Sequence, residues 1–108
     1  MYNIYPKVKK QLNKEGFFTF DKVNLFCESN KNVFMDLQEI IKINETSEEL
    51  ANVKYLIKDN LESQEYEIDI NPDCICIYAS EEVGLYYATK SLKQIIVDGK
   101  VECGYIKD

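Results

Sequence analysis

The side chains of this protein that could do chemistry are carboxylates, thiols and tyrosines, because the sequence contains no histidine. Glu65, Glu67 and Asp69 alternate with apolar residues, so we expect these carboxylates to share one face of a β-strand. Such a face could hold a hard cation or an acid/base pair. Nothing nearby supplies the backbone carbonyls of a calcium loop or an apolar pocket that would raise a carboxyl pKa. The pattern therefore favours a solvated strand face.

The thiols suggest a disulfide or a metal site, since the chain has four cysteines, Cys27, Cys74, Cys76 and Cys103. None belongs to a C-x-x-C pair, and there is no histidine to complete a zinc site. Cys74 and Cys76 are expected on the same face of one strand about 6.6 Å apart, near the limit for a disulfide. We therefore expect buried free thiols, which slightly favour a reducing, cytoplasmic compartment.

Further candidates lie close together in a predicted helix. Glu81 and Glu82 diverge by about 100° around such a helix, so they stabilise its N-terminus instead of forming a catalytic pair. Tyr86 and Tyr87 could stack on a sugar ring, but we expect one ring in the core and one at an interface. Gly84 is expected to let the first turn approach a neighbour closely. No serine or cysteine has a histidine base, and we predict no catalytic, cofactor-binding or metal-binding residue in this chain.

Length and charge exclude several classes of function. The 108 residues fit one domain, 1–108, with a single core. No apolar run is long enough to span a membrane, and the N-terminus lacks the apolar region of a secretion signal. The net charge of −6 argues against nucleic acid, because Lys7, Lys9 and Lys10 form the only dense basic patch. We predict neither nucleic acid nor a membrane as a partner.

The elements that position these residues follow from the hydrophobic period. Tyr66, Ile68 and Ile70 alternate with charged residues, and a β-branched run resumes at 74–78 after the turn 71–73, which predicts an antiparallel hairpin. Ser80 is expected to cap a helix that runs to Asp98-Gly99. The apolar stripe of that helix follows a 3.6-residue period.

The first half of the chain predicts shorter elements. Strands are expected at 17–20, 23–27 and 53–57, a helix at 29–41, a loop at 44–52, and a final strand at 101–106. Together these elements predict an α+β fold, with a single mixed, largely antiparallel β-sheet and two α-helices packed on one face. The other face is expected to be a partly apolar surface that could rest against another domain, exposing Leu56, Cys74, Cys76 and Tyr78.

From Glu65 onward the sequence resembles the small domain that precedes the catalytic barrel in glycoside hydrolase family 20, the β-N-acetylhexosaminidases. The resemblance lies in the strand pair 66–70 and 75–79 and in the helix opening Gly84-Leu85-Tyr86-Tyr87-Ala88. Ile4-Tyr5-Pro6-Lys7 and 16–20 are similar to the start of that domain, and 105–108 to its exit. Residues 29–64 carry little of it.

The resemblance implies a parent enzyme that removes terminal β-linked N-acetylhexosamine by substrate-assisted, retaining hydrolysis. A Glu and a neighbouring Asp of a TIM barrel are implied as its catalytic pair, and neither matches a position in this chain. Residues 1–108 are then an inactive N-terminal accessory domain. Its partner is implied to be its own C-terminal catalytic barrel, with N-acetylhexosamine glycans as the parent's substrate. Two alternatives are the equivalent domain of family 84, the O-GlcNAcase and hyaluronidase-like enzymes, and a free-standing protein-interaction module.

Overall fold

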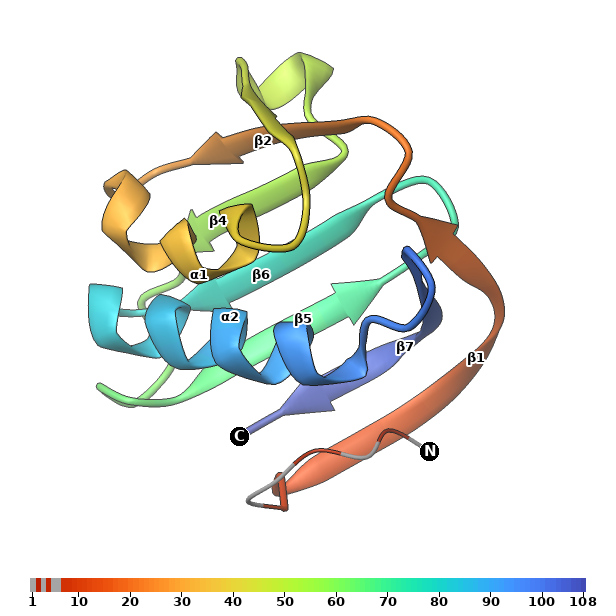
Figure 1. Cartoon of the computed structure of the whole chain (residues 1–108). Helices are drawn as coiled ribbons and strands as arrows, with labels where there is room; N and C mark the ends of the chain where they lie inside the picture. Colours follow the sequence, from red (N-terminus) through yellow and green to blue (C-terminus); the bar gives the residue numbers. More distant parts are fainter. Residues whose placement is uncertain (1, 3, 5–6) are drawn as a thin grey trace.

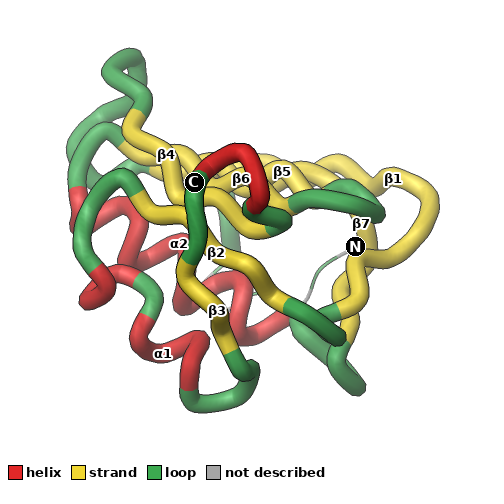
Figure 2. Tube along the Cα trace, turned by 90° about the horizontal axis from the view of Figure 1, so that it is seen from above, coloured by secondary structure: helices red, strands yellow, loops and turns green. Residues whose placement is uncertain are grey.

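The computed structural model describes residues 2, 4 and 7–108, which fold into one mixed sheet with two α-helices on one side of it (Figures 1 and 2). The helices are α1 (Met35–Gln38) and α2 (Glu82–Ile95), and single 3-10 turns span Lys31–Val33 and Glu48–Leu50. The strands are β1 (Lys10–Thr19), β2 (Val23–Cys27), β3 (Ile43–Glu45), β4 (Val53–Ile57), β5 (Tyr66–Ile70), β6 (Ile75–Ala79) and β7 (Lys100–Lys107).

The strand order across the sheet is β1-β7-β5-β6-β4-β2-β3. The pairs from β1 to β6 are antiparallel, and the pairs from β6 to β3 are parallel. The predicted hairpin is confirmed, because β5 and β6 pair antiparallel with Ile68 opposite Ile77. The α+β fold class predicted from the sequence is therefore confirmed.

Helix α2 covers the central strands and closes the core. Leu85, Ala88 and Leu92 are fully buried on its inner side, as the 3.6-residue period predicts. Ile68 and Ile77 of the hairpin lie fully buried in the same core cluster. Burial of the apolar surfaces of α2 and of the strands beneath it supplies the main driving force for folding. Within the part of the chain that the structure describes, no helix has the length and apolar character needed to cross a membrane.

Both ends of α2 differ from the prediction. The N-cap residue is Glu81, and its side chain makes no capping hydrogen bond. The Ser80 hydroxyl instead donates to the carbonyl of Glu62, at 3.2 Å, so it ties the helix to the loop before β5. The helix ends at Ile95, before Asp98 and Gly99. These two residues have positive φ angles of 54° and 73° and form a tight hairpin turn into β7.

The first predicted helix is broken in the structure. Asn30 does act as a cap, because its side chain accepts a hydrogen bond from the backbone N–H of Asn32 at 3.0 Å. The 3-10 turn then stops at Phe34, whose φ and ψ of −118° and 9° are not helical, and α1 has only four residues. Leu37 is fully buried but Ile40, expected on the same apolar face, is 48% exposed.

The chain leaves α1 early because it must reach β3. Residues 43–45, partly assigned to a loop by the sequence, pair in parallel with β2, with Val23 opposite Ile43. Strand β1 also differs, since it begins at Lys10 and lies at the opposite edge of the sheet from β3. Tyr5 and Pro6, which contribute to the family resemblance, lie outside the described residues.

Candidate functional site

The face of the sheet opposite the helices carries many of the residues that were singled out by type, and we call it the bare face. Strand registers place Asp69 between Cys76 and Tyr105, and Glu67 between Tyr78 and Lys107. Because side chains alternate across a strand, these carboxylates, thiol and tyrosines share one surface. Leu56, Cys74, Cys76 and Tyr78 are half-buried there, so the bare face is partly apolar, as the sequence predicts.

The carboxylates of this face are engaged with separate partners. Glu67 is only 9% exposed, and its carboxylate accepts hydrogen bonds from the Lys58 ammonium at 2.8 Å and from the Tyr105 hydroxyl. Burial raises the pKa of Glu67, but the hydrogen bonds from Lys58 and Tyr105 outweigh it and leave that pKa below its usual value. The expectation of a solvated strand face is therefore wrong for Glu67, because Lys58 and Tyr105 compensate its burial.

The two remaining carboxylates do not join Glu67. Asp69 pairs with Lys14 at 2.6 Å, whereas Glu65 precedes β5 and faces Lys9 at 3.9 Å. Among residues 2, 4 and 7–108, no group of three or more Cys, Asp or Glu side chains could hold a metal ion. The three carboxylates whose spacing suggested a cation site therefore pair with three different lysines.

The cysteines are free, but their burial differs from the prediction. Only Cys103 is buried, whereas Cys27, Cys74 and Cys76 are half-buried. Residue type alone suggested a core position, but Cys76 alternates with the core residues Ile75 and Ile77 and so points to the bare face. The Sγ atoms of Cys74 and Cys76 lie 3.8 Å apart.

The two tyrosines of α2 both lie on its outer side. Tyr86 is 37% exposed and Tyr87 is 40% exposed, so the expectation that one ring belongs to the core is wrong. The flanking residues Leu85 and Ala88 take the inward positions, and the helical turn carries both rings outward. The Lys90 ammonium lies 4.8 Å from the centre of the Tyr86 ring, in cation–π contact.

Gly84 confirms the predicted close approach at the start of α2. A Cβ atom on this glycine would lie 2.7 Å from both the Ala79 Cβ and the Glu65 carbonyl oxygen. The helix therefore packs directly on the end of β6 and on the loop before β5.

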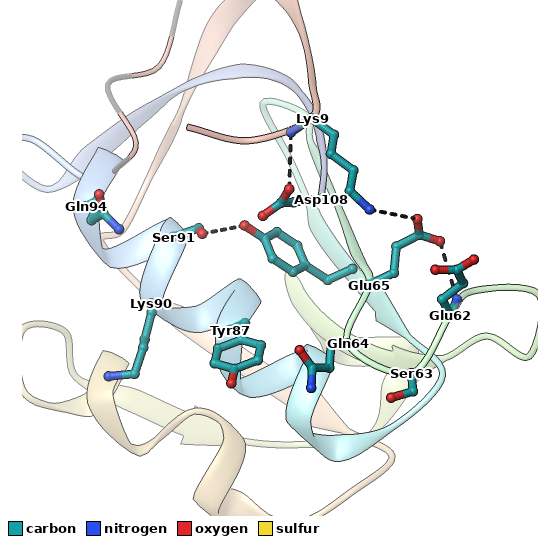
Figure 3. A pocket seen from close by; sticks show the side chains of 11 residues that line it. Lys9, Glu62, Ser63, Gln64, Glu65, Tyr87, Lys90, Ser91, Gln94 and Asp108 are labelled. Atoms are coloured by element: carbon teal, nitrogen blue, oxygen red, sulfur yellow. Dashed lines mark hydrogen bonds and ion pairs between the residues drawn. The ribbon is translucent and has the colours of Figure 1, made fainter. Parts of the chain in front are cut away.

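A cavity of about 770 Å³ lies at this junction (Figure 3). Its walls come from four segments far apart in the sequence, namely Lys9, the loop 62–65 with Tyr66 at the start of β5, α2 and Asp108. Figure 3 shows the α2 side chains along one side of the cavity and the loop along the other. From α2 the lining side chains are Tyr87, Lys90, Ser91 and Gln94.

Hydrogen bonds fix the end of the chain at the wall of this cavity. The backbones of Tyr66 and Asp108 exchange two N–H···O bonds of 2.8 and 3.0 Å, which extend the pairing of β5 with β7. The Lys9 backbone N–H donates to the Asp108 carboxylate at 3.2 Å. The Tyr66 and Ser91 hydroxyls are hydrogen-bonded to each other, and burial raises the pKa of Tyr66 despite this bond.

The cavity is better suited to docking another group than to catalysing a reaction. A nucleophile needs a base within hydrogen-bonding reach, and the Ser91 hydroxyl is paired with a tyrosine whose pKa is raised. Sequence reasoning missed this cavity because no motif or period connects its four segments. The resemblance of 105–108 to the exit of a domain was the one signal that pointed to this place.

Comparison with known families identifies the whole chain. A family model described as glycosyl hydrolase family 20, domain 2, matches residues 1–108. No curated protein sequence matches the chain. The family match rests on sequence and therefore adds to the fold evidence independently of the structure.

Solved structures share the fold at low identity. A β-N-acetylhexosaminidase from Bacteroides fragilis is 22% identical with a TM-score of 0.86, and the match covers 97% of this chain and 24% of that one. The Streptomyces plicatus N-acetyl-β-hexosaminidase is 16% identical with a TM-score of 0.81, over 98% and 26% of the two chains. A protein named CpGH84B is 22% identical with a TM-score of 0.76, over 100% and 22%. The chain thus spans about a quarter of the length of these proteins.

These structures show the fold alone, and the fold does not separate the two glycosidase families considered from the sequence. CpGH84B carries the number of family 84 in its name and matches the entire chain. The family model makes the distinction, because it matches every residue from 1 to 108 and describes family 20.

Proposed function

The chain belongs to glycosyl hydrolase family 20, as domain 2 of that family, and from this premise we propose that it is a non-catalytic N-terminal accessory domain that supports a catalytic barrel. The proposed parent removes terminal β-linked N-acetylhexosamine, the activity that the names of the Bacteroides and Streptomyces proteins indicate. The full-length family match carries this proposal.

We propose that the helical side, and not the bare face, contacts the barrel. Tyr87 of α2 lines the cavity beside Asp108, so a domain that follows Asp108 begins next to this ring. Exposed apolar and aromatic side chains also occur at Met35 of α1, at Ile40 just after α1 and at Tyr86 of α2. Aromatic residues and methionine are enriched in buried interfaces.

The bare face is less suited to the same contact. Its carboxylates already have lysine partners, with Lys58 at 2.8 Å from Glu67 and Lys14 at 2.6 Å from Asp69. Burying these pairs under a second domain would cost desolvation free energy without forming new ion pairs. The partly apolar sheet surface expected from the sequence therefore exists, whereas the cavity that Asp108 lines lies beside α2.

A domain experiment tests this proposal. The 108-residue chain and a longer protein, the proposed parent in which a barrel follows this domain, are assayed with an aryl N-acetyl-β-glucosaminide. We expect hydrolysis only from the longer protein. Hydrolysis by the 108-residue chain would overturn the non-catalytic role, and an inactive longer protein would overturn the proposed parent activity.

A matched pair of variants tests the docking side in the longer protein. We expect Tyr87→Ser to destabilise the contact between domains by about 1–2 kcal/mol, as for an aromatic residue near the centre of an interface. Tyr78→Ser on the bare face is the control. The measurement is the rate of thermal inactivation, corrected for the effect of each variant on the isolated 108-residue chain. A larger corrected effect of Tyr78→Ser would place the barrel on the bare face.

A further inference from the structure

Cys74 and Cys76 form a pair of thiols that the docking proposal does not use. Both lie on the bare face, at the start of β6, and their Sγ atoms are 3.8 Å apart. Both side chains are half-buried, so solvent still reaches this part of the surface. Cys27 and Cys103 lie on β2 and β7 and do not belong to the pair.

The separation of the sulfurs suits the chelation of a single atom. Two sulfurs bound at about 2.3 Å to one centre stand about 3.4–3.8 Å apart, the shorter separation for a pyramidal centre and the longer for a tetrahedral one. A disulfide needs a sulfur–sulfur distance of about 2.0 Å, and Cys76 is fixed in the centre of the sheet between Lys54 and Asp69. Chelation therefore requires little movement, whereas a disulfide requires the sulfurs to approach by nearly 2 Å.

We propose that Cys74 and Cys76 form a dithiol site that captures a monosubstituted trivalent arsenical or a similar soft centre needing two protein ligands. Among the described residues, no third Cys, Asp or Glu side chain completes a cluster around them. An arsenical of this type brings its own carbon as the third ligand and is satisfied by two sulfurs. Thiolates are the side-chain ligands that soft centres prefer.

The capture step balances without an oxidant. The two S–H bonds break, two As–S bonds form, and the oxygen of the arsenical oxide leaves as water with both thiol protons. Arsenic stays trivalent throughout. Burial and the neighbouring Cys76 raise the pKa of Cys74 to about 11, and the Lys54 ammonium opposes them. Negative charge on one sulfur disfavours negative charge on the other. Binding one shared electrophilic centre relieves this repulsion.

The test uses the reduced 108-residue chain and phenylarsine oxide as the probe. We expect one adduct per chain by intact mass and the loss of two of the four thiols to a labelling reagent. Peptide mapping of the unlabelled thiols should identify Cys74 and Cys76. An excess of a small dithiol should release the adduct, whereas glutathione at the same concentration should not.

Variants separate chelation from ordinary thiol reactivity. Cys74→Ser and Cys76→Ser should each weaken capture about 100-fold, because the second sulfur no longer acts at a high effective concentration. Cys27→Ser, which removes another half-buried thiol, should leave capture unchanged. Circular dichroism checks the fold of each variant. The peptide mapping uses the unchanged protein, so it tests the site even if a variant fails to fold. Protection of other cysteines, or capture that survives both substitutions, would overturn the site.

Discussion

Side chains that alternate along each strand form the two faces of the sheet, but different forces stabilise the two faces. On the helical side of β6, Ile75, Ile77 and Ala79 are fully buried under α2. On the bare face of the same strand, Cys76 and Tyr78 are half-buried, and the neighbouring charges are held in pairs with lysine. Apolar burial is worth far more than partly exposed ion pairs. Stability should therefore reside on the helical side, and the bare face should tolerate change.

The strongest test of this comparison substitutes adjacent residues of β6. Ile77→Ala should lower the free energy of unfolding by about 2–5 kcal/mol, because it leaves a cavity among fully buried side chains. Cys76→Ala, on the bare face, should cost less than about 1 kcal/mol. Urea unfolding followed by circular dichroism measures both. Equal losses for the two variants would contradict the assignment of stability to the helical side.

Gly84→Ala tests how closely the helical layer packs on the sheet. The added methyl group would lie 2.7 Å from the Ala79 Cβ and from the Glu65 carbonyl oxygen, so helix and loop must move apart. We expect a loss of about 1–3 kcal/mol from overpacking, although alanine is the better helix former.

The control for that variant is Gly104→Ala on β7. A Cβ there would lie 2.5 Å from the Leu12 carbonyl oxygen and from the Tyr2 hydroxyl. This variant therefore also disturbs packing, but not at the contact between α2 and the sheet. Hydrogen exchange of the α2 amides distinguishes the two. Faster exchange throughout α2 is expected only for Gly84→Ala, and unchanged α2 exchange in that variant would show that the contact is dispensable.

The sequence predicted the hairpin and α2 because both have a clear period. Ile68, Ile70, Leu85 and Leu92 report directly which side of each element is buried. Strand β3 could not be predicted in this way, since three residues establish no period and its pairing partner β2 lies 20 positions earlier, with Asn24 opposite Asn44. The early end of α1 has the same cause, because the connection to β3 overrides the apolar pattern that includes Ile40.

The surfaces were less predictable than the core. Cysteine burial was predicted from residue type, and the prediction fails at Cys76 because its position on the strand decides which face it joins. The burial of Glu67 was missed because Lys58 and Tyr105 come from two other segments. The cavity beside Asp108 combines four separate segments. Local patterns report burial within an element, whereas a site depends on contacts between elements.

A smaller effect is expected from the polar contact inside the helical layer. The buried Tyr55 hydroxyl and the Thr89 hydroxyl are 2.6 Å apart, and Thr89 also donates to the Val33 carbonyl at 2.6 Å. Thr89→Val keeps the shape but removes the oxygen, which leaves buried polar atoms without a partner. We expect a loss of about 1–2 kcal/mol.

The companion variant Tyr55→Phe completes a double-mutant cycle. If the two hydroxyls are coupled, the double variant should lose clearly less than the sum of the single losses, because each single variant already breaks the shared hydrogen bond. Additive losses in urea unfolding would contradict the coupling.

The smallest effect is expected on the bare face, at Glu67. Its pKa is lower in the folded protein than in the unfolded chain, so its ion pair stabilises the fold above the unfolded pKa. This contribution is lost as the pH falls through the lowered folded pKa. Glu67→Gln should therefore be less stable than the unchanged protein at pH 7. The loss should be about 1 kcal/mol at most, because Lys58 is 41% exposed. The difference should shrink on acidification below pH about 4. Glu15→Gln, at an exposed position of β1, is the control for loss of one charge. Urea unfolding at pH 7, 5 and 3 measures the difference. A deficit of Glu67→Gln that grows toward acid would contradict this prediction, because it would show that folding raises the pKa of Glu67.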